Sequence, residues 1–412
     1  MRRGKLGMGL IGPGFIAKHH LDAVRRLGDV EIIGIAGSSA ASAQRKVKEL
    51  CAGRAFPHYK ELVADPDIDV VHNTTPSHVH FEITMAAVLA GKHVVSDKPL
   101  AMTAHECAKL RDAAEKVGVV NAVTFNYRGN PLVQQARAMI ANEELGPLVY
   151  IHGQYLQDWT TDDGVYSWRM DPEKAGPSSA VADIGSHWID LAEHVCGTRI
   201  THVLADLNTV VSTRYSSGQS AEAFGSRDGG ERKPVQIHAE DLASVLLRFE
   251  NGVRGSLKVS QVLPGHKNDL QLEVNGRISS LRWKQEEQNE LWIGRHDGAN
   301  SNLCKDPSLL IPTAATYAQL PAGHQESWAD AFRNVIGDIY SVIRDHDRQK
   351  TATLCTFADA YRTSCVVESM LESHARGGMW TAICDPFPSA ENSRSSLNAA
   401  LVHGMPAGAP PA

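Results

Sequence analysis

The sequence predicts an α/β protein in which a doubly wound parallel sheet is followed by an α+β domain with a large, mostly antiparallel open sheet. Up to about residue 125, short apolar strands alternate with helical segments, which is the pattern of a parallel sheet. After about residue 130, longer segments alternate with period two and are joined by Asn-Gly pairs, as in antiparallel hairpins. We expect one domain over residues 1–126, a second over 127–387, and a disordered tail over 388–412.

In the first domain we expect short apolar strands, separated by amphipathic helices, at residues 6–11, 31–36, 70–73, 93–96 and 119–123. The segment from Thr103 to Glu106 has the spacing of a capping box that opens a helix. Lys98 therefore follows a strand, at the edge where open α/β sheets bind their ligands.

In the second domain, Val253, Leu257 and Val259 alternate with polar residues, and Asn251-Gly252 and Asn275-Gly276 mark two hairpin turns. One broad face of this sheet must be covered, either by helices over 328–343 and 356–371 or by a partner subunit. Residues 212–234, rich in Ser, Gly and charge, are expected to form a mobile surface excursion.

The composition favours a protein that binds small molecules and copies of itself. A net charge of -6 over 412 residues, with no block of basic residues, argues against nucleic-acid and membrane surfaces. The seven cysteines are scattered without a C-x-x-C pair, which suits the reducing cytoplasm and argues against a zinc cluster or any other metal site. Arg2-Arg3 resembles an export signal, but the apolar stretch behind it is short and is read as the first strand.

A glycine loop, Gly12-Pro-Gly14-Phe15-Ile16-Ala17, follows the first strand directly and precedes an amphipathic stretch. Gly12 allows a tight turn, Gly14 lets the backbone approach a pyrophosphate, and Ala17 lets the next helix lie close to its strand. The free N–H groups at the helix start would face the phosphates. We therefore expect a Rossmann domain that binds NAD or NADP.

Asp183 and His187 form a second candidate motif, in Asp183-Ile-Gly-Ser-His187. Four residues apart at a helix start, they share a face, so that the carboxylate can fix the tautomer of the imidazole and hold its pKa in the working range. The alternative is a helix cap beside a structural histidine. The upstream dinucleotide domain favours the functional interpretation.

The chain resembles the Gfo/Idh/MocA family of sugar and inositol oxidoreductases over roughly residues 5–385. The resemblance rests on five segments: Gly12 to Ala17, Thr75 to His80, Ala90 to Val94, Asp97 to Leu100, and Asp183 to Asp190. It implies a Rossmann domain followed by a domain whose open sheet is used for oligomerisation, and a homo-oligomer, a dimer or tetramer. It also implies that Lys98 lies at the nicotinamide and that Asp183 and His187 complete the catalytic set.

The expected binding residues follow from these motifs. The cofactor set is Gly12, Gly14, Phe15, Ile16, Ala17, Gly37, Ser38, Ser39, Thr74, Thr75, Pro76, His80, Asp97 and Lys98. The substrate set, near the expected interdomain cleft, is Asn126, Tyr127, Arg128, Tyr166, Trp168, Arg169 and His187. Aromatic side chains beside arginines suit a polyhydroxylated ring.

The chain departs from the family pattern at two positions, where Asp97 replaces a glutamate and Ser77 replaces an asparagine. The shorter Asp97 alters the geometry expected at Lys98, and Ser77 removes an amide from the cofactor site. At the end of the second strand, Gly37-Ser38-Ser39 holds no acid to select NAD and no arginine to clamp the phosphate of NADP. The choice of cofactor therefore stays open.

Oxidation of a secondary alcohol needs a base, a group that stabilises the alkoxide, and a hydride acceptor. His187 is the expected base, oriented by Asp183, and Lys98 the expected stabilising group. A relay centred on the lysine is the alternative. We expect a dehydrogenase acting on a sugar, glycoside or inositol. The alternatives are an NAD-dependent glycoside hydrolase, which would oxidise C3 transiently, eliminate the aglycone and return the hydride, and a dinucleotide-bound sensor without turnover.

Overall fold

The computed structural model describes residues 4–216, 232–345 and 352–384. Its first layer is a parallel sheet of six strands in the order β3-β2-β1-β4-β5-β6. The strands are β1 (Leu6–Ile11), β2 (Val30–Ala36), β3 (Arg54–Phe56), β4 (Val70–Asn73), β5 (His93–Ser96) and β6 (Asn121–Val123). The predicted doubly wound parallel sheet is confirmed, and β3 is a strand that the sequence analysis missed.

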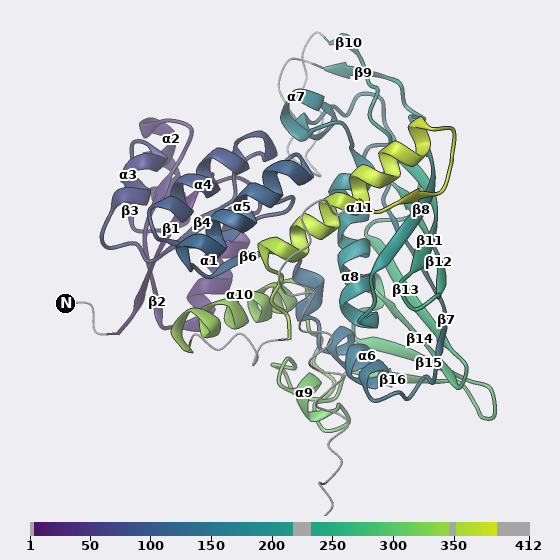
Figure 1. The fold of residues 1–412 in the computed structure, drawn as a ribbon. Coiled ribbons are helices and arrows are strands. Elements are labelled where there is room, and N and C mark those ends of the chain that lie inside the picture. The colour runs from purple at the N-terminus through teal and green to yellow at the C-terminus, as the bar shows by residue number, and fades with distance from the viewer. Residues whose placement is uncertain (1–3, 217–231, 346–351, 385–412) are drawn as a thin grey trace, which may run out of the picture.

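Helices cover both faces of this sheet (Figure 1). They are α1 (Ala17–Leu27), α2 (Ala40–Leu50), α3 (Tyr59–Ala64), α4 (His80–Leu89) and α5 (Ala104–Val117). α5 begins at the predicted cap, where Thr103 Oγ1 accepts a hydrogen bond from the Glu106 amide. The strands thus end beside helix starts at one edge, where the glycine loop and Lys98 lie.

The second layer is a sheet of nine strands in the order β16-β15-β14-β13-β7-β12-β11-β8-β17. Its neighbours pair antiparallel except for β7 and β12, which are parallel. The strands are β7 (Leu148–Leu156), β8 (Ile200–Asn208), β11 (Leu242–Phe249), β12 (Arg254–Ser260), β13 (Asp269–Gly276), β14 (Ser279–Lys284), β15 (Glu290–Arg295), β16 (Ser301–Cys304) and β17 (Thr381–Ala382). The predicted large, mostly antiparallel sheet is confirmed.

The two Asn-Gly pairs differ in their roles. Asn251-Gly252 connects β11 to β12, with Gly252 at φ 81°. Asn275-Gly276 instead ends β13, and the chain turns at the next two residues before β14 begins. The second hairpin exists, but its turn lies two residues beyond the predicted one.

Three helices pack on one face of the large sheet: α6 (Pro131–Ala141), α8 (Ser186–Cys196) and α11 (Phe357–Ala375). α11 corresponds to the helix predicted over 356–371. The helix predicted over 328–343 is α10 (Trp328–Asp345), and it packs on the parallel sheet beside α1 instead. Its apolar residues, including Phe332 and Ile339, meet Val70 and Val95 of that sheet, so the C-terminal half of the chain completes the first layer.

A buried polar pair fills part of the interface between α1, β4 and α10. His20 Nδ1 and His72 Nδ1 share a hydrogen bond of 2.9 Å, and His72 Nε2 lies 3.0 Å from the hydroxyl of Tyr340. Burial lowers the pKa of both histidines to about 3, and the neighbouring His72 contributes to the shift at His20. Both imidazoles are therefore neutral at physiological pH.

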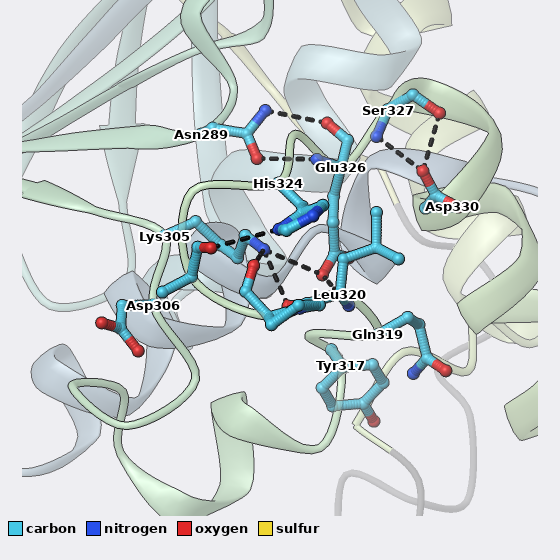
Figure 2. A network of polar contacts seen from close by, with 12 residues as sticks. Asn289, Lys305, Asp306, Tyr317, Gln319, Leu320, His324, Glu326, Ser327 and Asp330 are labelled. Atoms are coloured by element: carbon cyan, nitrogen blue, oxygen red, sulfur yellow. Dashed lines mark hydrogen bonds and ion pairs between the residues drawn. The ribbon is translucent and has the colours of Figure 1, made fainter.

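The connection from β16 to α10 is held by a buried ion pair, shown in Figure 2. Lys305 Nζ lies 3.5 Å from Glu326 Oε1 and donates to the carbonyls of Leu320 and Pro321 at 2.9 and 3.0 Å. Asn289 exchanges two hydrogen bonds with the Glu326 backbone. Both charged side chains are almost fully buried, so this loop enters α10 in one fixed arrangement.

Parts of the remaining predictions lie outside the described residues. The excursion expected over 212–234 begins and ends in two short paired strands, β9 (Thr213–Ser216) and β10 (Lys233–Gln236), and residues 217–231 between them are not described. The tail expected over 388–412 is also outside the described residues. No helix in the described ranges is long and apolar enough to cross a membrane. The domain limits at 126 and 387 stay predictions.

Candidate active site

The glycine loop adopts a conformation that only glycine tolerates at its first position. Gly12 has φ +88°, and a Cβ there would lie 2.6 Å from the Cα of Thr75. The loop is fixed to the end of β4 because Thr74 Oγ1 donates to the Gly12 carbonyl at 2.7 Å. A Cβ at Gly14 would meet nothing within 4 Å, so this part of the loop faces open space.

A cleft of about 400 Å³ lies between this loop and residues 168–183, in the segment that leads from β7 to α8. Ten residues of the predicted cofactor set line it: Gly12, Gly14, Phe15, Ile16, Ser38, Thr74, Thr75, Pro76, Asp97 and Lys98. α1 begins here with no side-chain cap and no acidic residue in its first turn. Open backbone beside an uncapped helix start fits the pyrophosphate of a dinucleotide.

Four other predicted cofactor residues do not line the cleft and support its walls instead. Ala17 is fully buried in α1, Gly37 packs closely on α2, and Ser39 caps α2 by accepting from the Ser42 amide. The two ring nitrogens of His80 lie 2.6 Å from the carbonyls of Thr75 and Pro99. His80 thus joins the β4 loop to the segment that carries Lys98.

Lys98 and Asp183 meet across the two layers of the fold. Lys98 Nζ donates to Asp183 Oδ1 at 2.7 Å and to the Asp183 carbonyl at 2.6 Å. Arg169 Nε lies 3.5 Å from the same carboxylate oxygen, and Gln261 donates to Oδ2 at 2.9 Å. Burial would raise the pKa of Asp183, but Lys98 and Arg169 outweigh it and hold the pKa well below its usual range. The carboxylate is therefore ionised and clamps the ammonium.

The expected pairing of Asp183 with His187 is wrong. Residues Val181–Gly185 form a π-helical turn before α8, whose hydrogen bonds span five residues, so the four-residue spacing does not place the two side chains as in an α-helix. The carboxylate turns to Lys98 instead. Among the described residues, the buried Nδ1 of His187 has no hydrogen-bond partner.

His187 does not line the cleft itself. Three aromatic rings surround the imidazole of His187. The ring centroids of Phe125, Tyr127 and Tyr155 lie 5.5, 5.2 and 6.1 Å from the imidazole centroid. Burial lowers its pKa well below 6.5, and the nearby Lys98 ammonium adds to this, against the opposing effect of Asp183. The imidazole is neutral at physiological pH, which a proton acceptor requires.

A chain of hydrogen bonds connects the carboxylate to these tyrosines, and the sequence analysis missed it. It passes from Asp183 through Gln261, then Gln157, to Asn268, with donor–acceptor distances of 2.9, 3.5 and 2.9 Å. Tyr155 donates to Asn268 Oδ1 at 2.7 Å, and the two tyrosine hydroxyls lie 2.8 Å apart. Tyr155 lies on β7, Gln157 and Gln261 directly follow β7 and β12, and Asn268 directly precedes β13. No local motif marks these residues.

The predicted substrate residues fall into three groups. Trp168 and Arg169 line the cleft, and the guanidinium lies 4.7 Å from the Trp168 ring centroid. Tyr166 and the buried Asn126 do not line it, and within the described residues Asn126 Nδ2 has no partner. Tyr127 contacts the His187 ring.

The contacts of Arg128 contradict its expected place among the substrate residues. It is buried, and its Nε and Nη2 donate to the Asp190 carboxylate at 2.9 and 2.5 Å. Its Nη1 donates to the Leu354 carbonyl at 2.8 Å. A bidentate pair with a residue 62 positions away uses the guanidinium inside the fold, so a substrate-binding role for Arg128 in this cleft is not supported.

Comparison with known proteins gives two adjoining family matches. Residues 6–125 match the model of the oxidoreductase family with an NAD-binding Rossmann fold, GFO_IDH_MocA, and residues 133–282 match the GFO/IDH/MocA C-terminal domain. Levoglucosan dehydrogenase of Pseudarthrobacter phenanthrenivorans is 30% identical over 393 residues, covering 90% of this chain and 96% of that protein.

Two solved structures have the same fold. A levoglucosan dehydrogenase in complex with NADH and levoglucosan superposes with a TM-score of 0.82 at 26% identity, covering 92% of this chain and all of that one. An inositol dehydrogenase homologue from Azotobacter vinelandii, complexed with NAD⁺, gives 0.81 at 28% identity, covering 92% and 98%.

Proposed function

The chain belongs to the Gfo/Idh/MocA family of NAD(P)-dependent oxidoreductases, and from this premise we propose that it oxidises a secondary alcohol of a sugar, sugar glycoside or inositol. The observation that carries the proposal is that Lys98 and Asp183 meet in the same cleft that the glycine loop lines. This arrangement supports a reactive role for the Lys98 ammonium beside the proposed dinucleotide site. The sugar class is supported by the relatives that bear the names of sugar dehydrogenases.

The residues of this chain divide the chemistry among them. When bound, the nicotinamide accepts the hydride. Lys98, fixed by the Asp183 carboxylate at 2.7 Å, would donate to the substrate oxygen as negative charge develops there. His187, neutral and partly buried, is the proposed acceptor of the hydroxyl proton. Trp168 would cover the C–H face of the ring, and Arg169 would bind its hydroxyls.

The test is a panel of sugars, glycosides and inositols with NAD⁺ and with NADP⁺, followed at 340 nm. We expect one class of secondary alcohol to give net NADH or NADPH, and the ratio of kcat/KM for the two cofactors fixes the preference. Aglycone release without net absorbance change would replace the proposal with redox-neutral glycoside hydrolysis. No turnover, together with tight dinucleotide binding, would favour a sensor.

The identity of the base can be tested separately. If His187 accepts the proton, His187→Gln lowers kcat by about 10²- to 10⁴-fold and leaves NADH affinity unchanged. If His187→Gln keeps near-wild-type kcat while Lys98→Met loses it, the proton leaves through a relay centred on the lysine. Tryptophan-to-NADH fluorescence transfer gives the affinity in both variants.

The outer face of the nine-stranded sheet supports a homo-oligomer. The described helices cover one face, while the other carries exposed Leu246 next to its cross-strand partner Leu204, with Tyr150 and Trp292 on β7 and β15 half-buried. Light scattering on the full chain should give a dimer or tetramer, and Leu246→Glu should shift it toward the monomer. If the wild-type protein were still monomeric at about ten times the protein concentration used in the activity assay, this proposal would be contradicted.

A further inference from the structure

A second cavity, of about 380 Å³, lies between α5, α6, α8 and α11, and none of its lining residues lines the nucleotide cleft. Leu354, in the loop before α11, also lines this cavity. Five arginines line it: Arg111, Arg128, Arg137, Arg199 and Arg362. Five guanidinium groups around one small cavity are costly unless negative charge compensates them.

The lining itself supplies three carboxylates, and all three already have partners. Asp190 is used by Arg128, as described above. Glu193 accepts from the Ile200 amide at 2.7 Å and lies 3.7 Å from Arg362 Nη2. Asp359 accepts from the Thr356 amide at 2.8 Å as part of the cap of α11.

Asp112, just outside the lining, pairs with Arg111 at 2.8 Å. Five guanidinium groups therefore face four carboxylates, and an excess of one positive charge remains. Burial raises the pKa of Glu193 to about 7, against the opposing effect of Arg362, so part of its negative charge is absent at neutral pH. Burial also lowers the pKa of His194 well below its usual value, with Arg128 and Arg137 adding to the shift, so this imidazole contributes no compensating or additional charge. The excess therefore persists at physiological pH.

Two of the arginines have donor groups without a hydrogen-bond acceptor among the described residues. Arg137 makes no hydrogen bond or ion pair with any described residue, and burial and the Arg128 charge both lower its pKa. The Nε of Arg362 is buried without a partner. A guanidinium is a planar fork that matches carboxylate and phosphate oxygens, so an oxyanion would satisfy these donors and the excess charge together.

We infer that this cavity binds a small, multiply charged oxyanion of the phosphate or polycarboxylate class, at a site separate from the dinucleotide cleft. Its volume suits a ligand of that size. The cavity also borders α8, the helix that carries His187, because the lining residue Asp190 lies three residues after His187 on that helix.

Calorimetric titration of the protein saturated with NADH tests this, because the occupied glycine loop then takes no added anion. Inorganic phosphate and citrate are titrated separately, with chloride adjusted to constant ionic strength. We expect saturable binding of at least one of these anions. The anion that binds with the lower dissociation constant shows whether the site prefers a phosphate or a polycarboxylate. Absence of saturable heat for both anions overturns the inference without touching the dehydrogenase proposal, which rests on turnover.

Arg137→Gln removes the unpartnered guanidinium, and Arg295→Gln, on the exposed end of β15, is the charge-matched control. Arg137→Gln should weaken the preferred anion by about 10-fold or more, the loss expected for one charge-assisted hydrogen bond. Arg295→Gln should stay within twofold of wild type. Equal affinities in the two variants would place the anion elsewhere and overturn the assignment, and retained NADH binding confirms that both variants are folded.

Discussion

Asp183→Asn is the substitution for which the structure gives the clearest magnitude. Asparagine keeps the size of the side chain but removes the charge that holds Lys98 Nζ at 2.7 Å and faces Arg169 Nε at 3.5 Å. A hydrogen bond to a charged group contributes about 1.5–3 kcal/mol, and the lysine and aspartate side chains are only 15% and 19% exposed, so solvent screens little of it. Since about 1.4 kcal/mol corresponds to tenfold in rate, kcat/KM should fall about 10- to 100-fold.

The assay is steady-state formation of NADH or NADPH with the best substrate of the panel, with dinucleotide affinity measured in parallel. Glu372→Gln is the matched control, because it removes a carboxylate that pairs with Arg376 at 3.2 Å on the exposed surface of α11. The control should be unchanged. If Asp183→Asn kept kcat/KM within threefold of wild type at unchanged dinucleotide affinity, the clamping of Lys98 by this carboxylate would have no part in the reaction.

Three further predictions concern binding and stability. Gly12→Ala should lower NADH affinity by at least tenfold, because its Cβ would lie 2.6 Å from Thr75; unchanged affinity in a fluorescence titration would contradict this. Lys305→Met leaves a buried carboxylate unpaired and should cost about 3–5 kcal/mol in urea unfolding, whereas a loss below 1 kcal/mol would show that the pair is dispensable. Because burial lowers the pKa of His20 and His72 to about 3, the unfolded state binds protons that the folded state does not. Stability should then fall as the pH drops from about 6.5 toward 3, by about 2 kcal/mol per histidine at pH 5, and an equal fall in His20→Leu would refute the assignment.

The features that could be predicted from the sequence are those that depend on local patterns. The order of strand, glycine loop and helix fixes where Gly12 and Gly14 lie, because a parallel strand must end at the edge of its sheet. The same reasoning placed Lys98 in the cleft, directly after β5. Period-two alternation identified the second sheet, since it reflects one buried face.

The features that could not be predicted depend on contacts between distant segments. Arg128 lies next to predicted site residues, yet its charge is used by Asp190, on another helix. α10 has a strong apolar face, but periodicity does not say which of two sheets that face will cover. The partners of Asp183 depend on a π-helical turn, which the spacing of a carboxylate and an imidazole does not reveal.

The central claim is that the Lys98 ammonium acts on the reacting oxygen of the substrate. It is tested most directly by kcat/KM for Lys98→Met, measured beside its NADH dissociation constant. The account predicts a fall of about 10³-fold or more in kcat/KM, as for the loss of one stabilising donor at a developing oxyanion, with NADH affinity within threefold of wild type. A folded Lys98→Met protein that turned over its substrate at a near-wild-type rate would contradict it.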